Sequence, residues 1–254
     1  MNISFHKKSG DSSLGIEFFW ELSVRSKAPI KITDQFIPEL WFDYFFIKSG
    51  ALRYRRNPNS IAVRVPKQFL KTLHTYSFTF EFFTPITIYG ARLSLKFAET
   101  FKDKLSANLL TNQGWAPKTV DSLEDFSESL KQYLLNHQTR AYPPIFSYEL
   151  KESKWFEHYS ARQKRRMYKS IFGVSKKELQ NIQNLHLFLE QTCDFSHQNP
   201  RIIQHITPDV FYDQPHLNHA FKKITGFSPV EYFENNSILQ DNLMSASYNK
   251  NSNS

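Results

Sequence analysis

Residues 211–232 read FYDQPHLNHAFKKITGFSPVEY and decide the interpretation of this chain. Asp213 is suited to cap a helix because its side chain accepts a backbone N–H, and Pro215 lies in the first turn, where a missing N–H costs least. Apolar residues at spacings of four and three form one face of this helix: Leu217, Phe221 and Ile224. The pattern predicts a short helix that starts near Gln214, packs on one side and leaves its polar side free.

A turn and a second helix follow. Gly226 suits the left-handed backbone conformation that ends a helix. Ser228 and Pro229 are typical of the cap and first position of another helix. A helix, a glycine turn and a helix in this order indicate a helix-turn-helix motif.

The residues of this stretch resemble a known family. The matching positions are Tyr212, Asp213, Gln214, His216, Leu217, Phe221, Lys222, Lys223, Gly226, Ser228, Pro229 and Tyr232. They resemble the second helix-turn-helix of AraC/XylS-type bacterial transcription regulators. The resemblance implies an α+β chain, with a β-rich N-terminal sensor-like domain followed by an all-α C-terminal domain with two helix-turn-helix motifs joined by a linker helix.

The resemblance also predicts a first motif upstream, and residues 160–179, SARQKRRMYKSIFGVSKKEL, fit it. Ser160 is suited to cap a helix, and Gly173 with Ser175 repeats the turn seen at Gly226. Residues 178–191 carry leucine and isoleucine at helical spacing, as expected for the linker helix.

Candidate DNA contacts follow from the resemblance, which implies that each recognition helix lies in a major groove, about one DNA turn apart. On the second helix the candidates for base edges are Gln214, Asn218 and His219, with Lys222 and Lys223 on phosphate. On the first helix Arg162, Gln163 and Arg166 face the groove, and Lys164, Arg165 and Lys169 supply charge.

The charge of the chain suits a polyanion. The net charge is +8, and residues 160–177 contain seven Lys or Arg and no acidic residue. Such a stripe favours double-stranded DNA, because neutralised phosphates release counterions. Lys164 and Val210 depart from the family, which usually has leucine and glycine there. They motivate an alternative, a binding module that keeps the fold but acts through protein contacts or dimerisation.

The first half of the chain has a different pattern. Aromatic and β-branched runs separated by Pro and Gly predict strands from residue 14 to about residue 95. Residues 121–137 have helical periodicity and suit a connector or a dimer seam. We therefore expect a β-rich sensor-like domain at 1–98, a connector and linker at 99–147, an AraC-like DNA-binding domain at 148–236 and a disordered tail at 237–254.

Other classes of protein lack support. Eighteen consecutive apolar residues are absent, and the N-terminus lacks the apolar core of a signal peptide, so we expect a cytoplasmic protein without membrane contact. Cys193 is the one cysteine, which excludes a multi-thiolate zinc site. His216 and His219 lack further ligands, so we predict neither metal nor cofactor. Glu39 and Asp43 are better read as rim residues of a cavity than as catalytic acids.

The sequence thus predicts a DNA-binding transcription regulator and not an enzyme. The expected partners are double-stranded DNA, a small-molecule effector in the N-terminal domain and a second copy of the chain as a homodimer.

Overall fold

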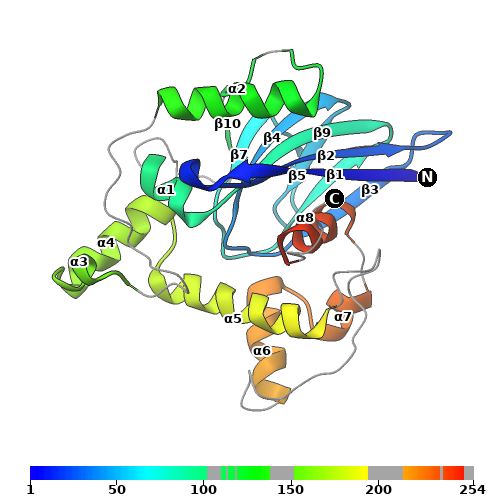
Figure 1. Cartoon of the computed structure of the whole chain (residues 1–254). Coiled ribbons are helices and arrows are strands. Elements are labelled where there is room, and N and C mark those ends of the chain that lie inside the picture. The colour runs from blue at the N-terminus through cyan, green and yellow to red at the C-terminus, as the bar shows by residue number, and fades with distance from the viewer. Residues whose placement is uncertain are drawn as a thin grey trace.

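The computed structural model describes residues 1–101, 110–112, 114–117, 119–137, 152–193, 214–234 and 237–248. Its first part is built from strands in two antiparallel sheets (Figure 1). The larger sheet has the order β1 (Asn2–Asp11), β2 (Ile16–Arg25), β9 (Ile86–Leu93), β4 (Phe42–Ser49), β7 (Gln68–Lys71) and β10 (Leu110–Asn112). The smaller sheet has the order β3 (Lys31–Phe36), β8 (Phe78–Phe83), β5 (Leu52–Arg55) and β6 (Val63–Arg64).

The larger sheet is buried on both faces, and β4 shows why. Phe45 and Ile47 pack in the cluster that fills the space toward the smaller sheet, whereas Tyr44 and Phe46 pack in the cluster beneath the helices. Successive side chains of a strand point to opposite faces, so a run of aromatic residues fills both cores. The unbroken apolar run in β4 therefore reflects a strand covered on two sides.

Eight α-helices are described: α1 (Leu95–Phe101), α2 (Leu123–Asn136), α3 (Lys154–Glu157), α4 (Ala161–Phe172), α5 (Lys176–Thr192), α6 (Gln214–Thr225), α7 (Pro229–Glu234) and α8 (Ile238–Tyr248). In Figure 1, α2 lies on one side of the sheets and α5, α6 and α7 lie on the other, with α8 between them and the strands.

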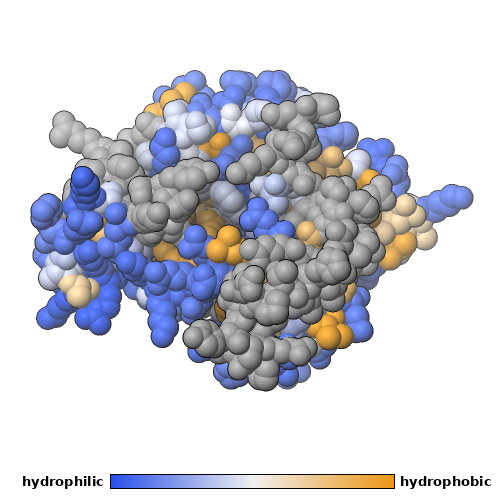
Figure 2. Space-filling model, turned by 60° about the horizontal axis from the view of Figure 1, so that its bottom comes forward, coloured by the Kyte–Doolittle hydropathy of each residue, from blue (hydrophilic) through white to orange (hydrophobic). Residues whose placement is uncertain are grey.

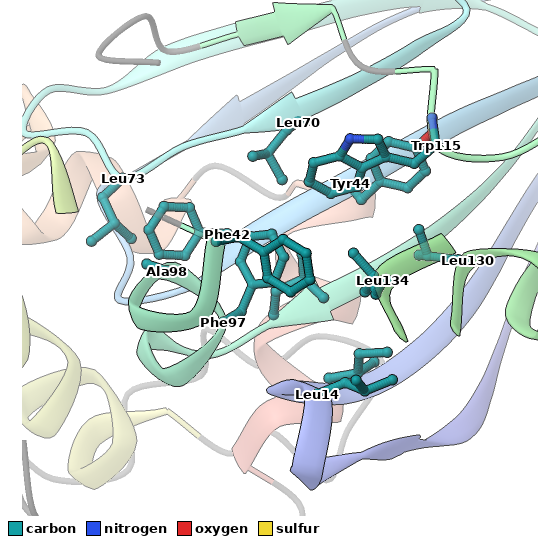
Figure 3. Packing of buried hydrophobic residues seen from close by; sticks show 14 of the residues in the cluster. Leu14, Phe42, Tyr44, Leu70, Leu73, Phe97, Ala98, Trp115, Leu130 and Leu134 are labelled. Atoms are coloured by element: carbon teal, nitrogen blue, oxygen red, sulfur yellow. The ribbon is translucent and has the colours of Figure 1, made fainter. Parts of the chain in front are cut away.

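The first core joins the larger sheet to α1 and α2. Trp115 stacks on Tyr44 with ring centroids 4.9 Å apart, and the Tyr44 hydroxyl accepts the backbone N–H of Trp115 at 3.0 Å. Leu130 and Leu134 of α2 complete this core (Figure 3). The aromatic rings of the first half are thus used for packing between layers.

The helix ends follow the predicted capping signals. Ser160 starts α4 and Ser175 starts α5, each with a reciprocal capping box. Gly173 and Gly226 have φ of 75° and 81°, the left-handed conformation in which glycine avoids a Cβ clash. Asp213, the predicted cap of α6, lies outside the described residues.

The predicted fold class is wrong in its second half. Instead of an independent all-α domain, α4 shares a core with the sheet half: Tyr168 and Phe172 belong to the same buried cluster as Leu14 and Phe97. The two helix-turn-helix motifs with a linker helix are likewise not seen as a separate unit, since α3 has four residues and residues 194–213 lie outside the described chain. The apolar faces of these helices are buried against the strand half as well as against each other.

The C-terminal segment also departs from expectation, because residues 238–248 of the predicted disordered tail form α8. Leu239 and Leu243 are fully buried in the core between the sheets, and Ser237 exchanges hydrogen bonds of 3.1 and 3.0 Å with the backbone of Gln35. The side chain of Asp34 accepts the backbone N–H of Leu239. The polar composition of this segment hid an amphipathic helix that packs on β3.

Candidate nucleic-acid interface

Helix α4 separates an apolar face from a basic one. Tyr168, Ile171 and Phe172 are buried. Arg162, Arg165 and Arg166 are exposed at the spacing of one helical face. Among the described residues no carboxylate forms an ion pair with any of the three. These arginines form a cationic surface about one turn long.

The two lysines of α4 that were candidates for DNA contact, Lys164 and Lys169, each form an ion pair with a carboxylate. Lys164 Nζ lies 2.8 Å from Glu152 Oε2, and Lys176 Nζ lies 2.9 Å from Glu152 Oε1. Burial works to raise the pKa of Glu152, but hydrogen bonds from Lys164, Lys176 and Tyr168 hold it at about 2. Lys169 pairs with Glu178 at 3.0 Å. Sequence reading missed these acids because both lie outside the basic run of α4.

Gln163 has a structural role at the start of α4. Its side-chain oxygen accepts the backbone N–H of Ser160 at 3.0 Å and the Ser160 hydroxyl at 2.8 Å. The capping box therefore occupies one end of the amide and leaves its nitrogen for other contacts. Base contact by Gln163 stays a prediction. The capping hydrogen bonds restrict its side chain, so the amide nitrogen is the atom available for such a contact.

Helix α6 presents four of its five predicted contacts on its surface. Phe221 and Thr225 are buried. The exposed candidates are Asn218, His219, Lys222 and Lys223. Gln214 begins the helix, but its side chain lies outside what the structure describes.

Helix α5 fixes the position of α6. It has 17 residues and therefore spans about 26 Å. Phe188 meets Phe221 edge to face at 6.0 Å, and Phe221 meets Tyr232 of α7 at 5.3 Å. This aromatic contact forms a third buried cluster around α5, α6 and α7, so the orientation of α6 is set by packing.

A cavity of about 440 Å³ lies between α5 and α6, and two of the DNA candidates line it. His219 and Lys223 face this space together with Asn181 and Lys177 of α5. Asn218 and Lys222 do not line it. The exposed face of α6 is thus divided between a groove along α5 and an outward side.

A second cavity of about 660 Å³ separates the smaller sheet from the end of α6. Its walls come from β3, β5, β8 and the turn that follows α6, with Arg55, Arg56 and Lys223 as the cationic residues and Glu81 as the acid. The hydroxyl of Ser77 donates to the backbone carbonyl of Thr225 and links the sheet side of the cavity to α6. A molecule bound here contacts the sheet and the basic helix at once.

Glu39 and Asp43, predicted to be rim residues of a cavity, belong to a closed ion-pair network. Both carboxylates are fully buried, with Arg92 Nη2 2.5 Å from Glu39 Oε1 and Lys71 Nζ 2.9 Å from Asp43 Oδ2. Two acids and two bases balance in charge, as buried ions require. Their position beneath α8 identifies them as structural groups and corrects their reading as rim residues.

Comparison with known proteins gives distant similarity at the level of structure alone. No protein-family model matches the chain, and no curated protein matches its sequence. The crystal structure of ToxT from Vibrio cholerae O395 has a TM-score of 0.41 and 12% identity, and the match covers 82% of this chain and 98% of that chain. A 1.65 Å structure of ToxT from Vibrio cholerae has a TM-score of 0.40 and 10% identity, covering 82% and 98%. Wild-type ToxT from strain SCE256 with bound unsaturated fatty acid has a TM-score of 0.36 and 13% identity, covering 83% and 96%. Similarity of this degree does not establish a family.

The described residues contain neither a membrane-spanning helix nor a metal-binding cluster. None of the described helices has the length and apolarity needed to cross a membrane. Within the same residues, no group of three His, Cys, Asp or Glu side chains is arranged to hold a metal ion.

Proposed function

We propose that this chain binds double-stranded DNA with sequence preference through α4 and α6 and acts as a transcription regulator. The observation that carries the proposal is the exposed arginine face of α4, formed by Arg162, Arg165 and Arg166. Arginine is suited to this role because its planar fork pairs with guanine edges and with phosphate.

Helix α6 adds the second contact surface. Asn218 and Lys222 lie one turn apart on its outward side, an amide for adenine edges and a cation for phosphate. Helix α5 packs against α6 and follows α4 directly in the chain. Helix α5 thus connects the two contact helices over a length of about 26 Å.

We further propose that a small molecule in the 660 Å³ cavity regulates this binding. Lys223 lines the cavity and also belongs to α6, so a ligand here competes for one of the candidate phosphate contacts. Replacing Thr79, a half-buried residue of the cavity wall, with tryptophan should place an indole ring in the cavity, obstruct ligand binding and remove any ligand effect on DNA affinity. A ligand effect that survives in Thr79→Trp would place the effector elsewhere.

The experiment that tests DNA reading is selection from a random double-stranded library, followed by affinity measurements against salt concentration. Enrichment of a site with two half-motifs about one helical turn apart supports both helices as readers. Salt-dependent binding without an enriched sequence would reduce α4 and α6 to a general electrostatic surface and contradict the proposal.

Within a selected site, Arg166→Ala should relax preference at a particular base pair by roughly 1 to 3 kcal/mol. Lys222→Ala should weaken all sequences alike, because phosphate contacts carry no base information. Equal loss on every sequence for both variants would overturn the assignment of reading and phosphate roles.

A further inference from the structure

The hairpin of β5 and β6 carries a concentration of positive charge, and the proposed function uses only the part that lines the 660 Å³ cavity. Between Asp43 and Glu81 the sequence has no acidic residue and seven basic ones. Three of these basic residues are exposed arginines on or next to the hairpin: Arg53, Arg56 and Arg64. The charge therefore gathers on one edge of the smaller sheet.

The strand register places two of the arginines face to face. Arg53 of β5 is the direct cross-strand partner of Arg64 of β6. Directly opposed side chains in an antiparallel pair lie on the same face, and like charges in this position destabilise the pair. A bound anion would remove this repulsion.

The negative charge of the carboxylate next to Arg53 is already balanced by two other cations. Glu81 is the partner of Arg53 on the other side, but its carboxylate lies 2.6 Å from Arg55 Nε and 3.0 Å from Lys31 Nζ. A hydrogen bond from Arg55 is the largest cause that lowers the pKa of Glu81, so this carboxylate is ionised and shared between two cations. Arg53 and Arg64 form no ion pair with any of the described residues.

This basic edge continues to α6. Arg56, whose guanidinium lies 5.0 Å from the ring centroid of Tyr76, lines the same 660 Å³ cavity as Lys223 of α6. Arg64 lines a different cavity of about 230 Å³ with Lys48 and Lys67. Arg56 and Arg64 thus belong to two different cavities, and the cations extend from α6 across both strands of the hairpin.

We propose that the β5–β6 hairpin contacts the phosphate backbone of DNA beside the segment held by α6. An extended polyanion meets several separated cations at once, whereas a small anion reaches one or two of them. The proposal rests on the proposed DNA binding. It implies that the N-terminal half also contacts DNA. Figure 2 shows hydrophilic residues over much of the coloured surface of the face that it presents, with apolar patches among them.

The test uses the full chain and two duplexes, a short one limited to the selected site and a longer one extended by about one helical turn on each side. The variant is Arg53→Gln with Arg64→Gln. The matched control removes two exposed charges from β2 and α1, Arg25→Gln with Lys96→Gln.

On the long duplex the hairpin variant should bind roughly fivefold to tenfold more weakly per lost contact at about 0.1 M salt, and the log–log salt slope should fall by about 0.9 per contact. The short duplex and the control variant should show little change. Loss on both duplexes alike would overturn the flanking position, and an unchanged slope on the long duplex would overturn the hairpin contact itself.

Two readouts distinguish the hairpin contact from a change in folding and from a small-anion site. Thermal unfolding of the hairpin variant without DNA should occur at no lower temperature than that of the natural chain, because the substitution removes repulsion; a marked loss of stability would contradict the repulsion between the two arginines. A thermal shift with inorganic phosphate that disappears in the variant, without any effect of duplex length, would indicate a small-anion site and overturn the proposal.

The variant Arg162→Gln with Arg166→Gln separates the hairpin contact from the proposed function. If this variant also leaves duplex binding unchanged, the proposed function fails together with the hairpin contact. If the α4 variant loses duplex binding while the hairpin variant keeps it, only the proposed hairpin contact fails.

Discussion

Arg92 Nη1, on β9, lies 2.9 Å from the main-chain carbonyl oxygen of Leu243, on α8. The same guanidinium pairs with Glu39 and Asp43 and donates to the Ser247 hydroxyl at 2.8 Å. One fully buried side chain therefore ties the larger sheet to a helix about 150 residues further along the chain.

Arg92→Met should destabilise the fold strongly, by about 3 to 5 kcal/mol, because it leaves two buried carboxylates facing Lys71 alone. Urea unfolding measures the difference. The exposed Arg25→Met is the control and should change the unfolding free energy by less than about 0.5 kcal/mol. A loss for Arg92→Met no greater than this would show that the network carries no net interaction.

Leu243→Ala should lower the stability of strands and helices together. Leu243 is fully buried between the sheets, and truncating such a leucine costs about 2 to 5 kcal/mol. Because the helices share cores with the strands, unfolding followed by far-UV circular dichroism and by tryptophan fluorescence should give one coincident transition. Two separated transitions would argue for independent halves.

The attachment of α8 should weaken as pH rises. Burial raises the pKa of Asp34 to about 7, with repulsion from Asp241 adding to the effect, against an ordinary value of 3.8. The folded state therefore prefers the protonated acid, so its stabilising effect is complete below about pH 4 and is lost as pH rises toward 7.

Asp34→Asn should remove this dependence, which is on the order of 2 kcal/mol between pH 5 and pH 7.5. Urea midpoints of both proteins at the two pH values give the comparison. Taking the difference between the proteins cancels the contribution of His186, whose pKa burial lowers. Parallel pH profiles for the two proteins would show that Asp34 does not titrate in this range.

Glu152→Gln should strengthen DNA binding while reducing stability. The change releases Lys164 and Lys176 from their ion pairs and weakens the 2.9 Å hydrogen bond that the Tyr168 hydroxyl donates. Fluorescence anisotropy against salt should show a steeper slope than in the natural chain.

Lys164→Gln tests the same arrangement from the other side. Because Lys164 is held by Glu152, its loss should affect DNA affinity less than Arg166→Gln does. An equal effect of the two substitutions would show that the ion pair opens when DNA binds.

Local signals in the sequence predicted individual elements well. Ser160, Ser175 and Gly173 define helix ends through contacts within a few residues, and the structure has the predicted helices at these positions. The aromatic runs of the first half form strands, as their composition predicted, because β-branched and aromatic residues suit a pleated sheet.

Long-range contacts could not be predicted in the same way. Glu152 and Lys176 are 24 residues apart, and Asp34 meets Leu239 across 205 residues. Such pairings depend on how layers pack, which no local pattern encodes. The family resemblance predicted an independent helical domain, and the core that Tyr168 shares with Phe97 contradicts this independence.

Helix α8 has a consequence for the order in which the protein is made. Strands β1 to β9 leave the ribosome well before residues 238–248, yet Leu239 and Leu243 are part of the core between their sheets. Until this helix is made, the apolar strand residues that it covers lack these contacts and are exposed to aggregation and to chaperones. Synthesis of α8, more than folding of any strand, should set the moment at which the sheet core becomes protease resistant.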